Sequence, residues 1–150
     1  MHAGRLGLLL LAGALLGGCA AGATSTPSAP RDVLTISCDD FAAGGQGAST
    51  TPVERNVTVA PGESFRITLC SNPSTGFSWQ SPVIAGSADV SLLDHQVLPA
   101  SGTVTGAAGS EGFTFRAASA GTATIDFAYS RPWQGGEQGA WTATVSVDAQ

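Results

Sequence analysis

Residues 123–129 read Ala-Thr-Ile-Asp-Phe-Ala-Tyr, and they decide the fold because the largest apolar side chains fall on every second position. A period of two is typical of a strand with one face in a core and the other face in water. Turn-forming residues flank the stretch, with Ala120-Gly121 before it and Gly135-Gly136 after it. The stretch therefore predicts a half-buried strand.

The same alternation recurs along the chain from residue 34 to residue 147. The alternating sets are Leu34/Ile36, Val57/Val59, Phe65/Ile67/Leu69, Phe77/Trp79, Phe113/Phe115/Ala117 and Trp141/Ala143/Val145/Val147. No window of eleven residues shows a helical stripe with caps. We therefore predict an all-β protein, an immunoglobulin-like antiparallel β-sandwich of about seven to eight strands.

The beginning of the chain has the composition of an export signal. Met1–Arg5 carries one positive charge, and Leu6–Leu16 is an uninterrupted stretch of apolar residues and glycine. As a helix these eleven residues would rise only about 16 Å, roughly half of a hydrocarbon core, which favours a signal peptide over a membrane-spanning helix.

The signal ends in Leu-Gly-Gly before Cys19, which resembles the bacterial lipobox. The resemblance implies that residues 1–18 are a lipoprotein signal peptide and that Cys19 is lipidated. Residues 19–30 then hold the lipidated cysteine and a flexible tether of small residues and proline. We expect an exported protein, held by lipid on the outer face of a bacterial membrane, with its folded domain at residues 31–150.

The charge of the chain argues against nucleic acid as a partner. Six Lys+Arg stand against 11 Asp+Glu, for a net charge of -5. A chain without a basic cluster has nothing with which to neutralise a phosphate backbone.

Two cysteines remain once Cys19 is assigned to lipid. An even pair in an exported protein favours a disulfide between Cys38 and Cys70 over a catalytic thiol or a metal site. The alternation in the two strands does not place both cysteines on the core side. Cys38 lies on the same strand face as the apolar Ile36, whereas Cys70 lies on the face opposite to the apolar Leu69. A bulge or a strand end at Cys70 would reconcile them.

The inventory of side chains does not favour catalysis. A serine or cysteine nucleophile would need an imidazole as its base, and His95 is the histidine that remains once the signal peptide is removed. We expect His95 on the surface or at a strand edge. Asp39 and Asp40 are neighbours, and in a strand they would point to opposite faces. We predict a protein that is not an enzyme, with no catalytic residues, no metal and no cofactor.

Three loops are rich in glycine, proline and small polar residues. The first is Asn72, Pro73, Ser74, Thr75, Gly76 and Phe77; the second is Gly106, Ala107, Ala108 and Gly109; the third begins with Arg131, Pro132 and Trp133. Proline and glycine predict stiff turns in the first loop, and glycine in the second lets another backbone come close. Arginine and tryptophan in the third are common at the centres of protein interfaces.

In this order the three motifs resemble those of the chagasin family of cysteine-peptidase inhibitors. The first and third motifs match at every position, whereas Ala108 stands where the family has a glycine. The resemblance implies that residues 31–150 form an inhibitor domain whose three loops enter the cleft of a papain-like cysteine peptidase. It implies reversible, competitive inhibition by a monomer, with Thr75 over the catalytic thiolate.

Two other functions remain open from the sequence. An immunoglobulin-like adhesive or ligand-binding lipoprotein of the cell envelope would use Trp133 and Trp141 as platforms, although the alternation around Trp141 predicts that it lies in the core. A purely structural lipoprotein would explain the anchor and the sandwich but not the ordered set of loops.

Overall fold

The computed structural model describes residues 28–43, 51–100 and 107–150. The strands are β1 (Arg31–Ile36), β2 (Val53–Val59), β3 (Ser64–Ser71), β4 (Ser78–Trp79), β5 (Val83–Gly86), β6 (Val90–Leu98), β7 (Gly109–Ala117), β8 (Gly121–Ser130) and β9 (Trp141–Ala149). A short helix, α1 (Cys38–Ala43), and a 3₁₀ turn, η1 (Pro73–Thr75), complete the described elements. None of the described helices is long and apolar enough to cross a membrane.

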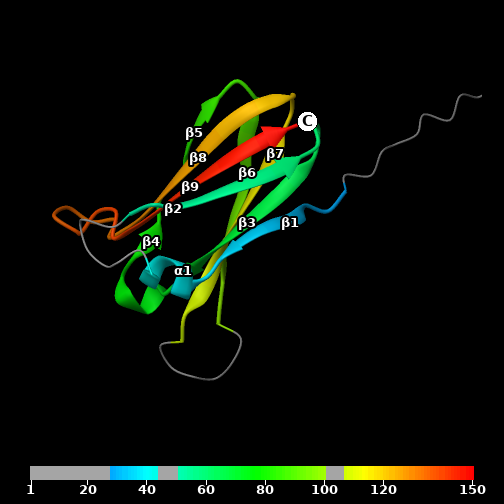
Figure 1. Cartoon of the computed structure of the whole chain (residues 1–150). Helices are drawn as coiled ribbons and strands as arrows, with labels where there is room; N and C mark the ends of the chain where they lie inside the picture. The colour runs from blue at the N-terminus through cyan, green and yellow to red at the C-terminus, as the bar shows by residue number, and fades with distance from the viewer. Residues whose placement is uncertain (1–27, 44–50, 101–106) are drawn as a thin grey trace, which may run out of the picture.

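The described strands form two sheets that pack face to face (Figure 1). One sheet has the order β1-β3-β7-β6, and the other has the order β2-β9-β8-β4 with β5 also paired to β8. The predicted immunoglobulin-like sandwich is confirmed, with nine described strands in place of the expected seven to eight. Its sheets are mixed and not purely antiparallel as predicted, because β1 pairs in parallel with β3 and β2 pairs in parallel with β9.

Aromatic rings from both sheets fill the core. Phe113 and Phe115 of β7 are completely buried, and each makes an edge contact with Phe127 of β8, at centroid distances of 5.2 and 6.2 Å. Phe65 of β3 stacks on Phe115 at 5.5 Å. These are inward positions of the predicted alternation, so the period-two pattern identified the core correctly.

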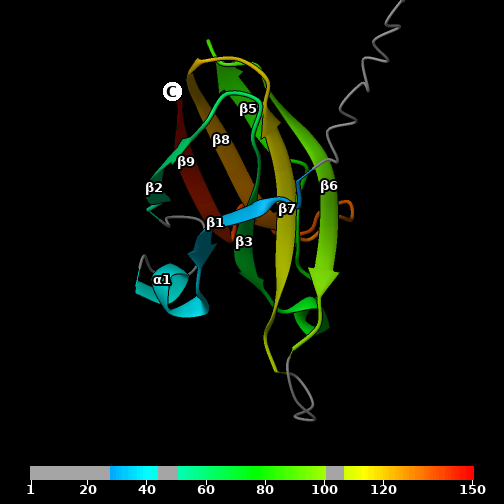
Figure 2. The ribbon, with the colours of Figure 1, turned by 90° about the vertical axis from the view of Figure 1, so that its right-hand side faces the viewer.

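Two strands lie outside the predicted set, β5 and β6. In β6, the edge strand seen at the right in Figure 2, the register with β7 shifts between Leu92 and Asp94. This irregularity interrupts the alternation, and Leu93 and Val97 are exposed. The strand therefore lacks the period that marks the others.

The disulfide between Cys38 and Cys70 is present, with their Cα atoms 5.1 Å apart. The conflict of strand phases is resolved at Cys38 rather than by a bulge at Cys70. Strand β1 ends at Ile36, and Cys38 begins helix α1, so the cysteine no longer follows the alternation of β1.

The expectation that Asp39 and Asp40 lie in a strand is wrong, because both belong to α1. Ser37 precedes the helix and exchanges bonds with Asp40: its backbone N–H and its hydroxyl donate to Asp40 Oδ2 at 2.8 and 2.6 Å. The Asp40 backbone N–H donates to Ser37 Oγ at 3.3 Å, which completes a capping box. The two hydrogen bonds from Ser37 lower the pKa of Asp40 from its ordinary value. The Arg55 guanidinium, whose Nη2 lies 2.6 Å from Asp40 Oδ1, lowers it further.

Candidate functional site

Three connections emerge at one end of the sandwich. Loop 1 (residues 72–77) follows β3, loop 2 (residues 99–108) follows β6, and loop 3 (residues 131–140) follows β8. In Figure 1, loop 1 lies between loop 3 and the neighbouring ends of β6 and β7. The described residues of the three motifs therefore lie at the same end of the fold.

Strand register fixes this arrangement. At the loop end of one sheet, Ser71 pairs with Gly109 and Leu98 pairs with Ser110, so the necks of loops 1 and 2 are adjacent. In the other sheet Ser130, which precedes loop 3, pairs with Ser78, which follows loop 1.

Loop 1 is a tight turn closed by its own atoms. The backbone N–H and the hydroxyl of Thr75 both donate to Asn72 O, at 3.1 and 2.6 Å, and the Gly76 N–H donates to Pro73 O at 3.1 Å. Gly76 has a φ of 78°, a left-handed conformation that glycine adopts without strain. Pro73, Ser74 and Thr75 are exposed at the tip.

Loops 1 and 3 touch each other directly. The Trp133 ring covers Gly76 so closely that a Cβ atom built at that position would lie 2.8 Å from ring atom Cη2. The Arg131 guanidinium lies over the Phe77 ring, 4.4 Å from its centroid. Even so, 52% of Trp133 is exposed, which leaves much of the side chain available to a partner.

Aromatic stacking joins this contact to the body of the domain. Phe77 stacks on Tyr129 at 5.4 Å, Tyr129 stacks on Trp141 at 5.1 Å, and Trp141 stacks on Phe41 of α1 at 5.1 Å. Trp141 is partly buried and packs against the core. It therefore supports the loops from within and is not an exposed platform.

Loop 3 is closed by a glutamine that the sequence analysis did not single out. Gln138 Nε2 donates to Arg131 O at 2.9 Å and to Gly136 O at 3.0 Å, and the Arg131 N–H donates to Glu137 O at 2.8 Å. An amide side chain in a glycine-rich loop is a weak signal in sequence, because many such residues only face solvent.

Loop 2 is described at its two ends. Ala107 and Ala108 are exposed, while Gly106 lies outside the described residues, as does Cys19. Gly109 begins β7, where a Cβ would lie 2.5 Å from Leu98 O. Glycine is therefore needed where the two sides of this loop approach each other.

His95 lies on edge strand β6, as expected, with 37% of its side chain exposed. It also has a buried partner that the sequence analysis did not predict, because its Nε2 lies 2.7 Å from Oε2 of Glu111. Among the residues that the structure describes, no group of three or more His, Cys, Asp or Glu is placed to hold a metal ion.

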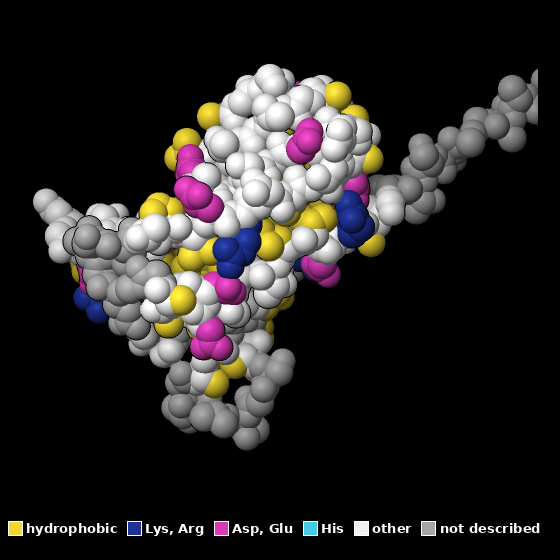
Figure 3. Space-filling model, in the orientation of Figure 1, with side chains coloured by type: hydrophobic (Ala, Val, Ile, Leu, Met, Phe, Trp, Pro, Cys, Tyr) yellow, Lys and Arg dark blue, Asp and Glu magenta, His cyan; other side chains and the backbone are white. Residues whose placement is uncertain are grey.

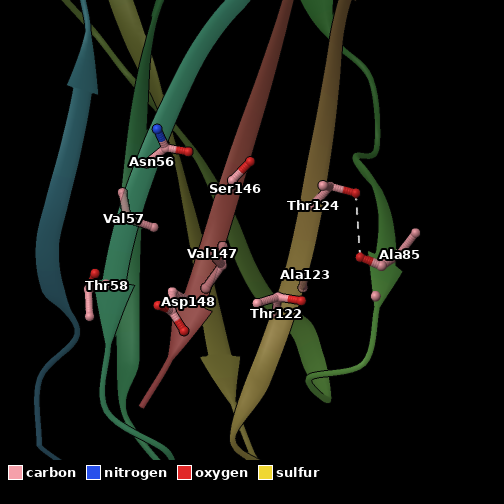
Figure 4. Close-up of a pocket in the computed structure, with 11 residues that line it drawn as sticks. Asn56, Val57, Thr58, Ala85, Thr122, Ala123, Thr124, Ser146, Val147 and Asp148 are labelled. Carbon is pink, nitrogen blue, oxygen red and sulfur yellow. Dashed lines mark hydrogen bonds between the residues drawn. The ribbon is translucent and has the colours of Figure 1, made fainter.

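A hollow lies away from the loops, on the outer face of the second sheet. It has a volume of about 670 Å³ and is open, and small polar side chains of β2, β9 and β8 line it (Figure 4). A smaller hollow of about 320 Å³ lies between loops 1 and 3. Its lining is Asn72, Thr75, Phe77, Tyr129, Glu137, Ala140 and Trp141.

The charges on the face shown in Figure 3 are sparse, and its basic side chains lie beside acidic ones. No basic patch appears on this face.

The chain is similar to known proteins over most of the folded part. Residues 58–147, which include all three motifs, match the model of the chagasin family of peptidase inhibitors, I42. Chagasin from Trypanosoma cruzi is 33% identical over 100 residues, covering 62% of this chain and 87% of chagasin.

Two solved structures share the fold. The cysteine protease inhibitor EhICP2 from Entamoeba histolytica has a TM-score of 0.53 and 20% identity, covering 81% of this chain and all of its own. PbICP-C, solved in complex with falcipain-2, has a TM-score of 0.55 and 17% identity, covering 77% of this chain and 98% of its own. Because a family model matches more than half of the chain, this protein belongs to the chagasin family of peptidase inhibitors and is not an enzyme.

Proposed function

We propose that this protein inhibits papain-like cysteine peptidases by placing loops 1, 2 and 3 in the active-site cleft, reversibly and in competition with substrate. The observation that carries the proposal is the direct contact of loops 1 and 3, with Trp133 on Gly76 and Arg131 over Phe77. One structure of similar fold is named a cysteine protease inhibitor, and another is bound to falcipain-2.

The form of loop 1 explains why it would block a peptidase without being cut. Asn72 O and Pro73 O accept hydrogen bonds from within the turn, so the segment is folded upon itself. A peptidase cleaves a peptide that it holds extended in its cleft. Thr75, at the exposed tip, would cover the catalytic thiolate without offering it a correctly oriented carbonyl.

Loops 2 and 3 would bind on either side of loop 1. The small residues Ala107 and Ala108 leave the backbone of loop 2 open to approach, and exposed Trp133 offers a large apolar surface. Loops 1 and 3 already pack against each other, so they would lose little conformational entropy on binding, which favours tight association.

We further propose that the protein acts at the outer face of a bacterial membrane, anchored by lipid on Cys19. The lipobox-like end of the signal supports this, as does the disulfide, which suits an oxidising compartment. The wild-type protein should partition into detergent and Cys19→Ser should stay in the aqueous phase. Equal partitioning would refute the anchor.

The inhibitor proposal is tested by titrating the exported Cys19→Ser protein against papain. We expect loss of peptidase activity at near-stoichiometric amounts, competition with substrate, and recovery of intact inhibitor on dissociation. Activity that persists at micromolar protein would refute the target class and favour an adhesive role.

A further inference from the structure

At the loop end of the sandwich, the inward side of three core strands becomes polar. Ser71 continues the inward series Phe65, Ile67 and Leu69 of β3, and Tyr129 ends the inward series of β8. Glu111 precedes Phe113 and Phe115 on the inward side of β7 and is 1% exposed. A carboxylate thus occupies a core position at the base of the loops.

These side chains form one hydrogen-bonded network. The Ser71 hydroxyl donates to Glu111 Oε1 at 2.6 Å, and Oε2 of the same carboxylate lies 2.7 Å from His95 Nε2. Tyr129 Oη lies 3.5 Å from Ser71 Oγ and accepts the backbone N–H of Asn72, the first residue of loop 1, at 2.8 Å. The His95 ring stacks on Phe113 at 4.1 Å.

The directions of these bonds follow from the groups involved. Ser71 donates its one hydroxyl proton to Glu111, so the Tyr129 hydroxyl is the donor in its contact with Ser71 Oγ. The Glu111 carboxyl group contacts Ser71 through one oxygen and His95 Nε2 through the other. The position of the loop 1 amide is thereby connected to a buried carboxyl group.

The network also reaches the necks of the other loops. His95 lies three residues before the end of β6, where loop 2 begins, and Glu111 lies two residues after Gly109, which follows loop 2. Tyr129 lies next to Ser130, after which loop 3 begins. The carboxyl group of Glu111 therefore links four of the six strands that flank the three loops, namely β3, β6, β7 and β8.

We propose that Glu111 is a positioning residue for inhibition. Through Ser71, Tyr129 and His95 it holds the three loop necks in register, so that the free protein already has its binding conformation. This rests on the proposed function. A buried carboxyl group destabilises a fold unless its hydrogen bonds are complete, so the position of Glu111 at the base of the loops indicates a role in fixing geometry.

The test uses the exported Cys19→Ser background and four variants, namely Glu111→Ala, Glu111→Gln, Ser71→Ala and Tyr129→Phe. Association and dissociation rates with papain are measured together with amide exchange at Thr75 and Gly76. These two amides keep their acceptors within loop 1 in every variant. The Gly62 amide, bonded to Ala117 O at the opposite end, serves as an internal reference.

We expect Glu111→Ala, Ser71→Ala and Tyr129→Phe to speed amide exchange at Thr75 and Gly76 and to slow association with papain about 10-fold. Association slows because a smaller fraction of the free inhibitor has its loops in the binding conformation, while the bound complex is little changed. Exchange at Gly62 and the dissociation rate should stay within about 3-fold of the parent. Glu111→Gln should restore most of the rate, since its amide oxygen still accepts from Ser71.

A core variant separates positioning from global stability. Ile125 is completely buried in β8, and Ile125→Val should lower stability without changing association or exchange in loop 1. If Ser71→Ala and Tyr129→Phe leave both readouts unchanged, or if Ile125→Val reproduces their effects, the positioning role is refuted. If the parent does not inhibit papain, the proposed function fails, while amide exchange still tests the network.

Discussion

The two ends of the sandwich are built in different ways. At the turn end the connections are short and backbone bonds close them: Gly62 N–H donates to Ala117 O at 2.6 Å, and Ala118 N–H donates to Asp89 O at 2.7 Å. At the loop end the connections are longer, and besides bonds within each loop they use side chains from other strands, such as Glu111 of β7 and Tyr129 of β8. Backbone atoms hold the first kind of connection, whereas the second kind also needs side chains that only the assembled fold brings to it.

The disulfide is the covalent link described at the loop end, and its loss should have the largest effect. Replacing Cys38 and Cys70 by serine should lower the free energy of unfolding by about 3 to 4 kcal/mol in the chain-entropy model. Amide exchange should rise earlier at Thr75 and Gly76 than at Gly62. Denaturant unfolding combined with site-resolved amide exchange checks this prediction. If exchange at Gly62 rises as early as exchange at Thr75 and Gly76, the disulfide does not stabilise the loop end more than the turn end.

Two glycines with the same conformation allow a matched test of the ends. Gly76 has φ of 78° beneath Trp133, and Gly62 has φ of 84° with nothing within 4 Å of a Cβ. Valine at either position should destabilise the fold through backbone strain, by about 1 to 2 kcal/mol. Only Gly76→Val should displace Trp133, and it should weaken papain inhibition about 100-fold, or about 3 kcal/mol.

The inhibition constant and the unfolding midpoint together decide this test. Equal inhibition by Gly76→Val and Gly62→Val would show that contact between loops 1 and 3 has no part in binding.

Trp133 should contribute to binding more than to stability. Trp133→Ala should weaken inhibition about 10- to 30-fold, as for an aromatic residue at an interface centre, with little change in the unfolding midpoint. Val83 is 65% exposed on β5 and provides the control. If Val83→Ala matches Trp133→Ala, the effect does not arise from the loops.

The smallest expected effects come from one partly exposed carboxylate at each end. The pKa of Asp40 is lowered first by Ser37, and the pKa of Glu63 is lowered first by its bond with Arg31. Each lowered pKa adds stability that is present above the ordinary carboxyl value, about 4, and is lost as the pH falls through the folded value.

Asp40→Asn and Glu63→Gln should therefore each flatten the acid limb of the stability curve, by less than about 1 kcal/mol, since both groups are partly exposed and solvent screens their ion pairs. Urea unfolding from pH 2 to pH 7 measures this. A variant that instead steepens the acid limb would contradict the sign of the shift.

The sequence predicted the parts of the molecule that depend on local pattern. Period-two alternation located the core strands, and the proline and glycine of loop 1 located its turn. Strand β6 was missed because its register is interrupted after Leu92, and α1 was missed because six residues with one buried apolar side chain, Phe41, form no stripe.

The network around Glu111 was not predicted, although the chain contained a signal. Extending the alternation of Phe115 and Phe113 back by one step places Glu111 on the core side. What the sequence could not supply were the partners, because Ser71, His95 and Tyr129 are brought together only by the pairing of β3, β6 and β7 and by the packing of β8 on them.

The direction of β1 has a mechanical consequence. Its first residue, Arg31, pairs with Glu63 at the turn end, and the strand runs parallel to β3 toward the loops. If a partner is bound to loop 1, tension applied through the N-terminus would act in shear on the backbone hydrogen bonds between β1 and β3. These bonds would bear the load together and would not break one after another. The Cys38–Cys70 bond joins the far ends of these strands, so the pull would travel along β1 directly to the base of loop 1 without peeling the sheet apart.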